Sequence, residues 1–224
     1  MWPNYVSKPT VFVSFGGATE GGDGWDDVFN DQQKAVQFGQ NAGHLLTSIQ
    51  NATQSSNPAY IGLDLDMEGQ TTTFPYFKDF VDAFRAIAPQ SQHPLMMCSY
   101  SGLADPGNND HTKLALMQNY GPAYGGIDFI NLMVDKAGGT AGSCDVYGGY
   151  WRDQALDVIP NSARVVGVWG LQAPTNRMDD PGCDDLFGWI KQNGIGLGIW
   201  EWWIETAGDF PVFNNMLARA KWSV

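Results

Sequence analysis

Three carboxylates alternate with three aliphatic side chains in YIGLDLDMEGQ, residues 60–70. The carboxylates belong to Asp64, Asp66 and Glu68. Because successive side chains of a β-strand point to opposite faces, a strand here places all three acids on one face. Neighbouring carboxylates in a poorly solvated place cannot all ionise fully, so the pKa of at least one must rise. A carboxyl group that keeps its proton near neutral pH can act as a general acid, and we predict that role for the outermost acid, Glu68.

Two simpler interpretations of this acidic segment compete with a catalytic one. The pattern D-x-D-x-E-G also resembles the start of a calcium-binding EF-hand loop, but the twelfth position of that loop needs an acid and is Pro75 here. A solvated edge strand could also carry acidic side chains, although polar residues would then be expected in place of Leu63, Leu65 and Met67. We therefore favour a catalytic row of acids.

Six short apolar runs, each followed by a helix candidate, surround and include this segment. They predict strands at residues 10–17, 60–68, 94–100, 127–134, 163–170 and 194–203. The clearest helix lies between Pro75 and Pro89, and a second is predicted at residues 31–52. The helix between Pro75 and Pro89 has an apolar stripe of Phe77, Phe80, Val81, Phe84 and Ile87, opposite Lys78, Asp79, Asp82 and Arg85. The helix at residues 31–52 has apolar residues at helical spacing, namely Val36, Ala42, Leu45, Leu46 and Ile49.

Strict alternation of strands and helices predicts parallel strands with helical crossovers, in a doubly wound open sheet or in a (β/α) barrel. A dinucleotide-binding sheet would want G-x-G-x-x-G after its first strand, and FGGATEGGDG lacks that spacing. Polar residues instead gather at the C-terminal ends of successive strands, where a TIM-type barrel has its active site. A closed barrel has eight strand–helix units. We therefore predict one partial barrel domain over residues 1–224, truncated at its N-terminus to about six units.

Composition narrows the function classes. A net charge of −12 argues against nucleic acid or an acidic membrane face as a partner. No apolar stretch is long enough to span a bilayer, and MWPNYVSKPT lacks the basic and apolar regions of a signal peptide. Cys98 lies in an apolar run, whereas Cys144 and Cys183 lie in loops where they could pair. No metal-ligand spacing is present, and no cofactor is predicted.

Four of the motifs resemble glycoside hydrolase family 18, the chitinases and their relatives. IGLDLDMEG (61–69) is similar to the fourth-strand signature D-G-x-D-x-D-x-E, and VFVSFGGAT (11–19) to the third-strand S-x-G-G motif. FINLMVD (129–135) is similar to the sixth-strand N-V-M-x-x-D motif, and IWEWWIE (199–205) to the final-strand motif. The resemblance extends from residue 10 to 205 and is closest to compact bacterial and fungal chitinases. It implies a (β/α) barrel and an extracellular setting.

The resemblance also implies a mechanism and roles for particular residues. Glu68 would protonate the glycosidic oxygen, and the substrate's own 2-acetamido oxygen would attack the anomeric carbon to give an oxazolinium intermediate. Asp66 would orient the acetamide N–H, and Asp64 would share a proton with Asp66. Trp200 would form the apolar floor under the distorted sugar.

Three departures from the family pattern bear on this expectation. The first Asp of the fourth-strand signature is Ile61 here. In the sixth strand, after Asn131, Met133 is followed by Val134 and Asp135, so that Asp135 takes the place of the usual Tyr or that contact is missing. The first two strands of the family barrel have no counterpart in the chain.

Other residues are expected at the margins of the site. Tyr100, Gln172 and Trp202 are candidates for lining the substrate cleft, as is Trp169. The three histidines, His44, His93 and His111, have no nucleophile or metal partner nearby in sequence, and we expect them to be surface or capping residues.

The sequence therefore predicts an endo-acting chitinase that cleaves β-1,4-linked N-acetylglucosamine in chitin or its oligosaccharides. A non-catalytic chitin-binding relative and an endo-β-N-acetylglucosaminidase are the alternatives. An open six-strand sheet would expose two edges, so we also expect self-association, or a rearrangement of the chain ends, to cover them.

Overall fold

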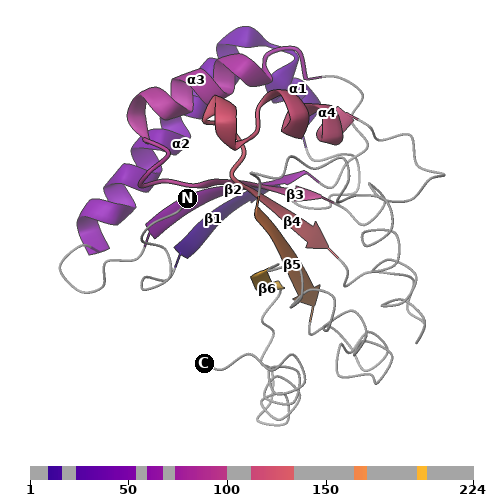
Figure 1. The fold of residues 1–224 in the computed structure, drawn as a ribbon. Helices are drawn as coiled ribbons and strands as arrows, with labels where there is room; N and C mark the ends of the chain where they lie inside the picture. The colour runs from indigo at the N-terminus through magenta and orange to yellow at the C-terminus, as the bar shows by residue number, and fades with distance from the viewer. Residues whose placement is uncertain are drawn as a thin grey trace, which may run out of the picture. The chain divides into compact units, whose positions relative to one another are not determined.

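The computed structural model describes residues 10–16, 24–53, 60–67, 74–99, 112–133, 164–170 and 196–200 (Figure 1). It divides the chain into two compact units. The first comprises residues 1–98, 110–130 and 160–163, and the second comprises residues 99–109, 131–159 and 164–224.

The strands and helices of the described residues alternate along the chain. The strands are β1 (Thr10–Gly16), β2 (Tyr60–Met67), β3 (Leu95–Ser99), β4 (Phe129–Met133), β5 (Arg164–Gly170) and β6 (Gly196–Trp200). The helices are α1 (Trp25–Phe29), α2 (Gln32–Thr53), α3 (Phe77–Ile87), α4 (Thr112–Asn119) and the 3₁₀ turn η2 (Pro122–Tyr124). All six predicted strands are confirmed, with bounds shifted by a few residues at most. The helices predicted after each of the first three strands are also confirmed, as α2, α3 and α4. None of the helices in the described ranges is long and apolar enough to cross a membrane.

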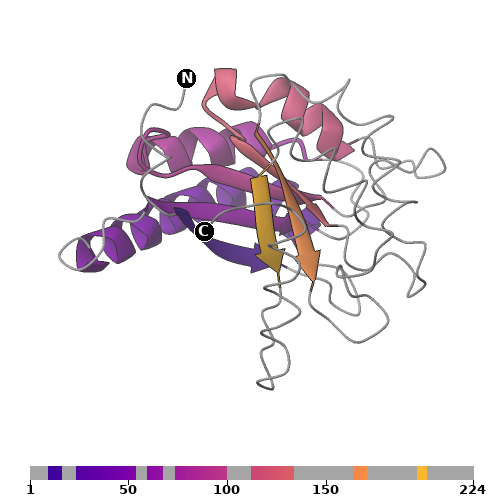
Figure 2. The ribbon, with the colours of Figure 1, turned by 60° about the horizontal axis from the view of Figure 1, so that its bottom comes forward.

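The strands of the first unit follow one another in the sheet in chain order, from β1 through β2 and β3 to the start of β4. β1 and β2 are parallel and in register from Thr10 opposite Tyr60 to Gly16 opposite Asp66. In the second unit, β5 and β6 are also parallel and lie side by side (Figure 2). The chain thus has an α/β fold with a parallel sheet, as predicted. Closure of this sheet into a barrel and the N-terminal truncation stay predictions.

Helices α2 and α3 cover one face of the sheet in the first unit (Figure 1). The apolar stripe of α3 is confirmed at four of its five positions, since Phe77, Phe80, Val81 and Phe84 are buried. The stripe predicted for α2 is partly wrong, because Leu45 is 40 % exposed and the buried face instead comprises Ala35, Gly39, Ala42, Gly43 and Leu46. Small residues are needed there, since a Cβ atom at Gly39 would lie 2.5 Å from the carbonyl oxygen of Phe80.

An aromatic cluster fills the space between the helices and the sheet. Phe29 of α1 is fully buried at its centre, and its ring lies 5.2–6.5 Å, centroid to centroid, from five others. These rings belong to Trp25, Phe38, Phe74, Phe77 and Phe80. The short helix α1, which the sequence analysis did not predict, anchors the connection after β1 through this cluster.

A buried polar cluster joins α3 to the beginnings of β3 and β4. Arg85, expected on the polar face of α3, instead forms a 2.9 Å ion pair with Asp128, whose side chain is fully buried. Asp128 also accepts hydrogen bonds from the Gln90 amide and from the backbone N–H of Leu95. The expectation of a surface position for His93 is wrong, because this residue is 2 % exposed and its Nδ1 lies 2.9 Å from the carbonyl oxygen of Ile61. The expectation holds for His44, which is exposed on α2.

Candidate functional site

The acidic segment forms the core strand β2, and it is buried along nearly its whole length. Every residue from Ile61 to Met67 is buried. Leu63, Leu65 and Met67 have no exposed surface. Asp64 and Asp66 are each only 6 % exposed, which is rare for charged side chains and excludes a solvated edge strand.

The two acids point away from the helices. Phe15, in register with Leu65, packs edge-on against Phe38 of α2, with ring centroids 5.8 Å apart, so the Leu65 side of the strand pair faces α2. Ser14, in register with Asp64, therefore belongs to the opposite face, and its hydroxyl donates a 2.7 Å hydrogen bond to Asp64 Oδ2. The predicted alternation is confirmed for Asp64 and for Asp66. Glu68 lies outside the described residues.

Two phenylalanine rings meet over this acidic face of the sheet. Phe12 of β1 contacts Phe129 of β4 edge-on, with ring centroids 5.6 Å apart. These strands are three positions apart in the sheet, which in a flat sheet would separate them by about 14 Å. Phe12 lies over Gly62, where a Cβ atom would come within 2.5 Å of the ring. The missing side chain at Gly62 thus leaves room for the Phe12 ring, which spans the sheet surface toward Phe129.

Burial changes the protonation of Asp64. Its pKa is raised from 3.8 to about 7, chiefly by desolvation. The Ser14 hydrogen bond opposes this rise, and the charge of nearby Asp66 adds to it. The second oxygen of Asp64, Oδ1, is buried and has no hydrogen-bond partner among the described residues. The prediction that at least one carboxyl pKa in this row rises is therefore confirmed. At neutral pH this carboxyl group can hold or release a proton.

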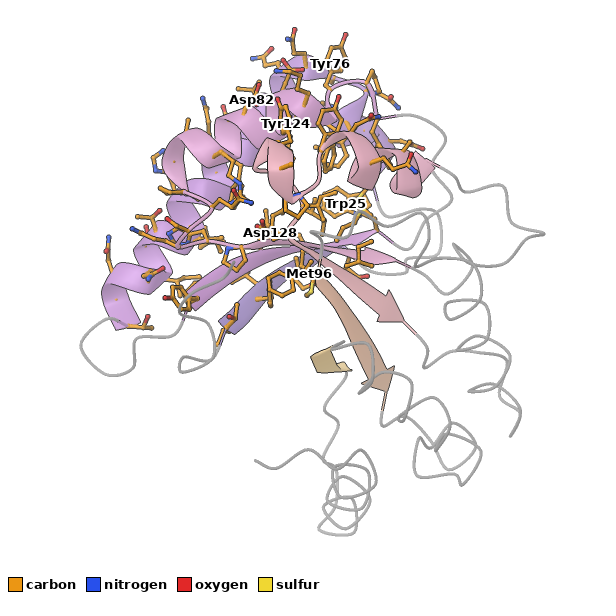
Figure 3. The ribbon with its side chains drawn as sticks, viewed as in Figure 1. Trp25, Tyr76, Asp82, Met96, Tyr124 and Asp128 are labelled. Carbon is orange, nitrogen blue, oxygen red and sulfur yellow. The ribbon has the colours of Figure 1, made fainter. Side chains whose placement is uncertain are left out.

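A tryptophan holds the end of β2. The indole Nε1 of Trp25 donates a 3.1 Å hydrogen bond to the backbone carbonyl oxygen of Asp66. The sequence reasoning did not single out Trp25, and it included Ser14 only as the serine of the S-x-G-G motif, without a role of its own. A signal was present for Ser14, because a lone hydroxyl at an alternating position of an apolar strand is suited to meet a polar group on the next strand. Trp25, labelled in Figure 3, carried no such signal, because it lies in the unpredicted helix α1 and nothing in the local pattern relates its indole to β2.

The other predicted site residues are only partly placed. The backbones of Asn131 and Met133 lie in β4, and Trp200 ends β6 opposite Gly170. Outside the described residues lie Glu68, Tyr100, Asp135, Gln172 and Trp202, as do Cys144, Cys183 and His111. Within the described ranges, no group of three or more histidine, cysteine or acidic side chains is arranged to hold a metal ion.

The chain is similar in fold to a solved structure, that of a GH18 chitinase from Pseudoalteromonas aurantia. The TM-score is 0.54 and the sequence identity 14%, and the match covers 92% of this chain and 74% of the other. No family model matches the sequence, and no curated protein matches it. At this identity the similarity is one of fold alone.

Proposed function

We propose that this protein is a glycoside hydrolase that cleaves β-1,4-linked N-acetylglucosamine in chitin or its oligosaccharides. The observation that carries the proposal is the pair Asp64 and Asp66, two buried carboxylates on the face of β2 away from the helices, one of them with a pKa near 7. Burying two acids beside each other is costly, and the hydrophobic core alone gives no reason for it. The similarity in fold to a GH18 chitinase supports this proposal.

The proposed reaction is retaining and substrate-assisted. Glu68 donates a proton to the glycosidic oxygen, and the acetamido oxygen of the sugar attacks the anomeric carbon as the glycosidic bond breaks. Asp66 accepts a hydrogen bond from the acetamide N–H and so orients the attacking oxygen. Asp64, with its raised pKa, shares a proton with Asp66 and takes it back as charge develops on the substrate.

The remaining predicted residues complete the site in this proposal. Trp200 stacks against the apolar face of the sugar at the cleavage point. The side chains of Asn131, Met133, Asp135 and Tyr100, together with Gln172 and Trp202, line the cleft around it. The strands close into a partial barrel with this cleft at their carboxyl ends.

Self-association belongs to the same proposal. Val11, on the outermost strand of the first unit, is 51 % exposed. A second copy of the chain that covers this edge would remove its side chain from water. Light scattering coupled to size-exclusion chromatography tests this, and a monomer at all concentrations would contradict it.

A time course of chitohexaose cleavage, followed by mass spectrometry, tests the catalytic proposal. We expect the wild type to release shorter oligosaccharides and Glu68→Gln to release none. Asp27→Asn is the matched control, because Asp27 is a surface carboxylate paired with Lys34 and its side chain is 77% exposed. Binding of chitohexaose without cleavage by the wild type would favour a chitin-binding protein, and cleavage of a glycoprotein glycan alone would favour an endo-β-N-acetylglucosaminidase.

A further inference from the structure

The hydrogen bond between Trp25 and Asp66 links α1 to the end of the acidic strand. Its donor is a side-chain N–H and its acceptor is a main-chain carbonyl, 41 residues later in the chain. β1 ends at Gly16, which is in register with Asp66, so the indole reaches β2 at the point where pairing between the two strands stops. The backbone that leads from Asp66 to Glu68 begins at this carbonyl group.

Gly16 makes room for the indole. Its φ is +112°, which side chains rarely tolerate. A Cβ atom here would lie 2.2 Å from the Asp66 carbonyl oxygen and 2.9 Å from two atoms of the Trp25 ring. The absence of a side chain at residue 16 thus permits the close approach of three groups: the end of β1, the indole and the end of β2.

The indole itself is held firmly. Trp25 is 4 % exposed and stacks on Phe29 with an interplanar angle of 10° and a centroid distance of 5.5 Å. Its ring also meets Phe38 of α2 edge-on at 5.7 Å. The carbonyl oxygen of Phe29 in turn accepts a hydrogen bond from the backbone N–H of Tyr76, just before α3. The indole is therefore packed between rings of α1 and α2, and the Tyr76 hydrogen bond holds the backbone of its stacking partner Phe29.

We propose that Trp25 is a positioning residue for the acids at the end of β2. By fixing the carbonyl group of Asp66, it holds the backbone from which the Asp66 side chain projects. This inference rests on the proposed function, in which the Asp66 side chain contacts the substrate. Catalytic groups must be held close to their productive geometry, and a displacement of about 1 Å can cost about 100-fold in rate.

Kinetics of Trp25→Phe on chitohexaose test the proposal. This variant keeps an aromatic ring and loses the N–H group, and we expect kcat to fall about 10-fold or more with KM changed less than about 3-fold. Replacement of Trp25 by 3-benzothienylalanine keeps the bicyclic shape and puts sulfur in place of the N–H group. We expect the same loss of kcat, because the hydrogen bond to Asp66 is lost while the packing of the ring is kept. Phe80→Leu is the control, because it loosens the same aromatic cluster without touching Trp25. Equal losses of kcat in Trp25→Phe and Phe80→Leu would overturn the proposal.

Hydrogen exchange of the β2 amides provides a readout that needs no substrate. We expect the amides of residues 64–67 to exchange faster in Trp25→Phe than in Phe80→Leu, at matched overall stability. This result would establish that Trp25 holds the end of β2 even if the wild type cleaves no sugar, in which case only the proposed function fails. Equal exchange in the two variants would overturn the positioning role even in an active enzyme.

Discussion

The Ser14 hydroxyl and the Asp64 carboxylate face each other across two parallel strands, joined by a 2.7 Å hydrogen bond. Both residues are on the face away from α2, and the carboxylate is buried there beside Asp66. The hydroxyl favours the charged form of Asp64, whereas burial and the charge of Asp66 favour the neutral form. The balance between these effects brings the pKa of Asp64 to about 7.

Removal of the Ser14 hydroxyl should move this balance. In Ser14→Ala the carboxylate loses its donor, so the pKa of Asp64 should rise above about 7. The titration of the Asp64 side-chain carboxyl carbon, followed by ¹³C NMR, measures this shift directly. Ser14→Thr keeps the hydroxyl and should titrate close to the wild type. A lower midpoint in Ser14→Ala would contradict the assigned role of the hydroxyl.

Neutralising Asp64 should stabilise the fold at alkaline pH. The folded pKa of Asp64 lies above its unfolded value of 3.8, so the folded state binds more protons and loses stability as the pH rises from about 4 to about 7. Asp64→Asn cannot ionise and so removes this loss. Above pH 7, the rise in pKa from 3.8 to about 7 corresponds to a loss of up to about 4 kcal/mol in the free energy of unfolding. Thermal unfolding at pH 4 and pH 8 checks it. We expect the gain in Tm at pH 8 to be larger than any gain at pH 4, and an equal effect at both values would contradict the raised pKa.

A side chain at residue 16 should disrupt the end of β1. Gly16→Ala places a methyl group where φ is +112° and where the Asp66 carbonyl oxygen would lie 2.2 Å away, and we expect a loss of at least about 2 kcal/mol in the free energy of unfolding. Gly24→Ala is a matched control, because Gly24 also has a positive φ, +74°, but no atom lies within 4 Å of the added carbon. It should cost about 1 kcal/mol. Urea denaturation compares the two, and similar losses would show that the contact with Asp66 is unimportant.

The ion pair between Arg85 and Asp128 should contribute strongly to stability. Asp128 is fully buried and Arg85 only 13% exposed, so Arg85→Met leaves a buried carboxylate without its cation and should cost about 3–5 kcal/mol. Lys78→Met breaks the pair with Asp82, in which both side chains are more than half exposed, and should cost less than about 1 kcal/mol. Urea denaturation at pH 7 measures both losses. Equal losses would mean that the buried pair contributes no more than a surface pair.

Burial of His93 should make the fold sensitive to acid. Desolvation and the charge of Arg85 lower the pKa of His93, against the hydrogen bond to the Ile61 carbonyl oxygen. Because the folded pKa lies below the unfolded value of 6.5, stability is fully present above about pH 6.5 and falls as the pH drops toward the folded pKa. The Tm of His93→Gln should therefore depend less on pH between 7 and 5 than that of the wild type. His44→Gln, at an exposed position of α2, should leave the wild-type dependence unchanged.

The sequence predicted the parts of this structure that depend on local pattern. The six strands follow from apolar, β-prone runs, the buried face of α3 from a stripe at helical spacing, and the shared face of Asp64 and Asp66 from strict alternation. The pairing of Arg85 with Asp128 and the burial of His93 escaped it, because both depend on contacts between segments far apart in the chain. The face of α2 was misassigned for a related reason, since Gly39 and Gly43 become buried only through the close approach of α3.

The order of the strands in the first unit sets the order in which the chain can assemble during its synthesis. Each strand pairs with one already made, so β1, α2, β2 and α3 can pack together before β4 leaves the ribosome. Arg85, however, precedes Asp128 by 43 residues, a delay of roughly 2 to 9 seconds at ordinary rates of translation. During that interval its guanidinium group lacks the buried carboxylate that it finally meets. Arg85 can therefore reach its final partner, and Leu95 the carboxylate that accepts its N–H, only after Asp128 has been synthesised.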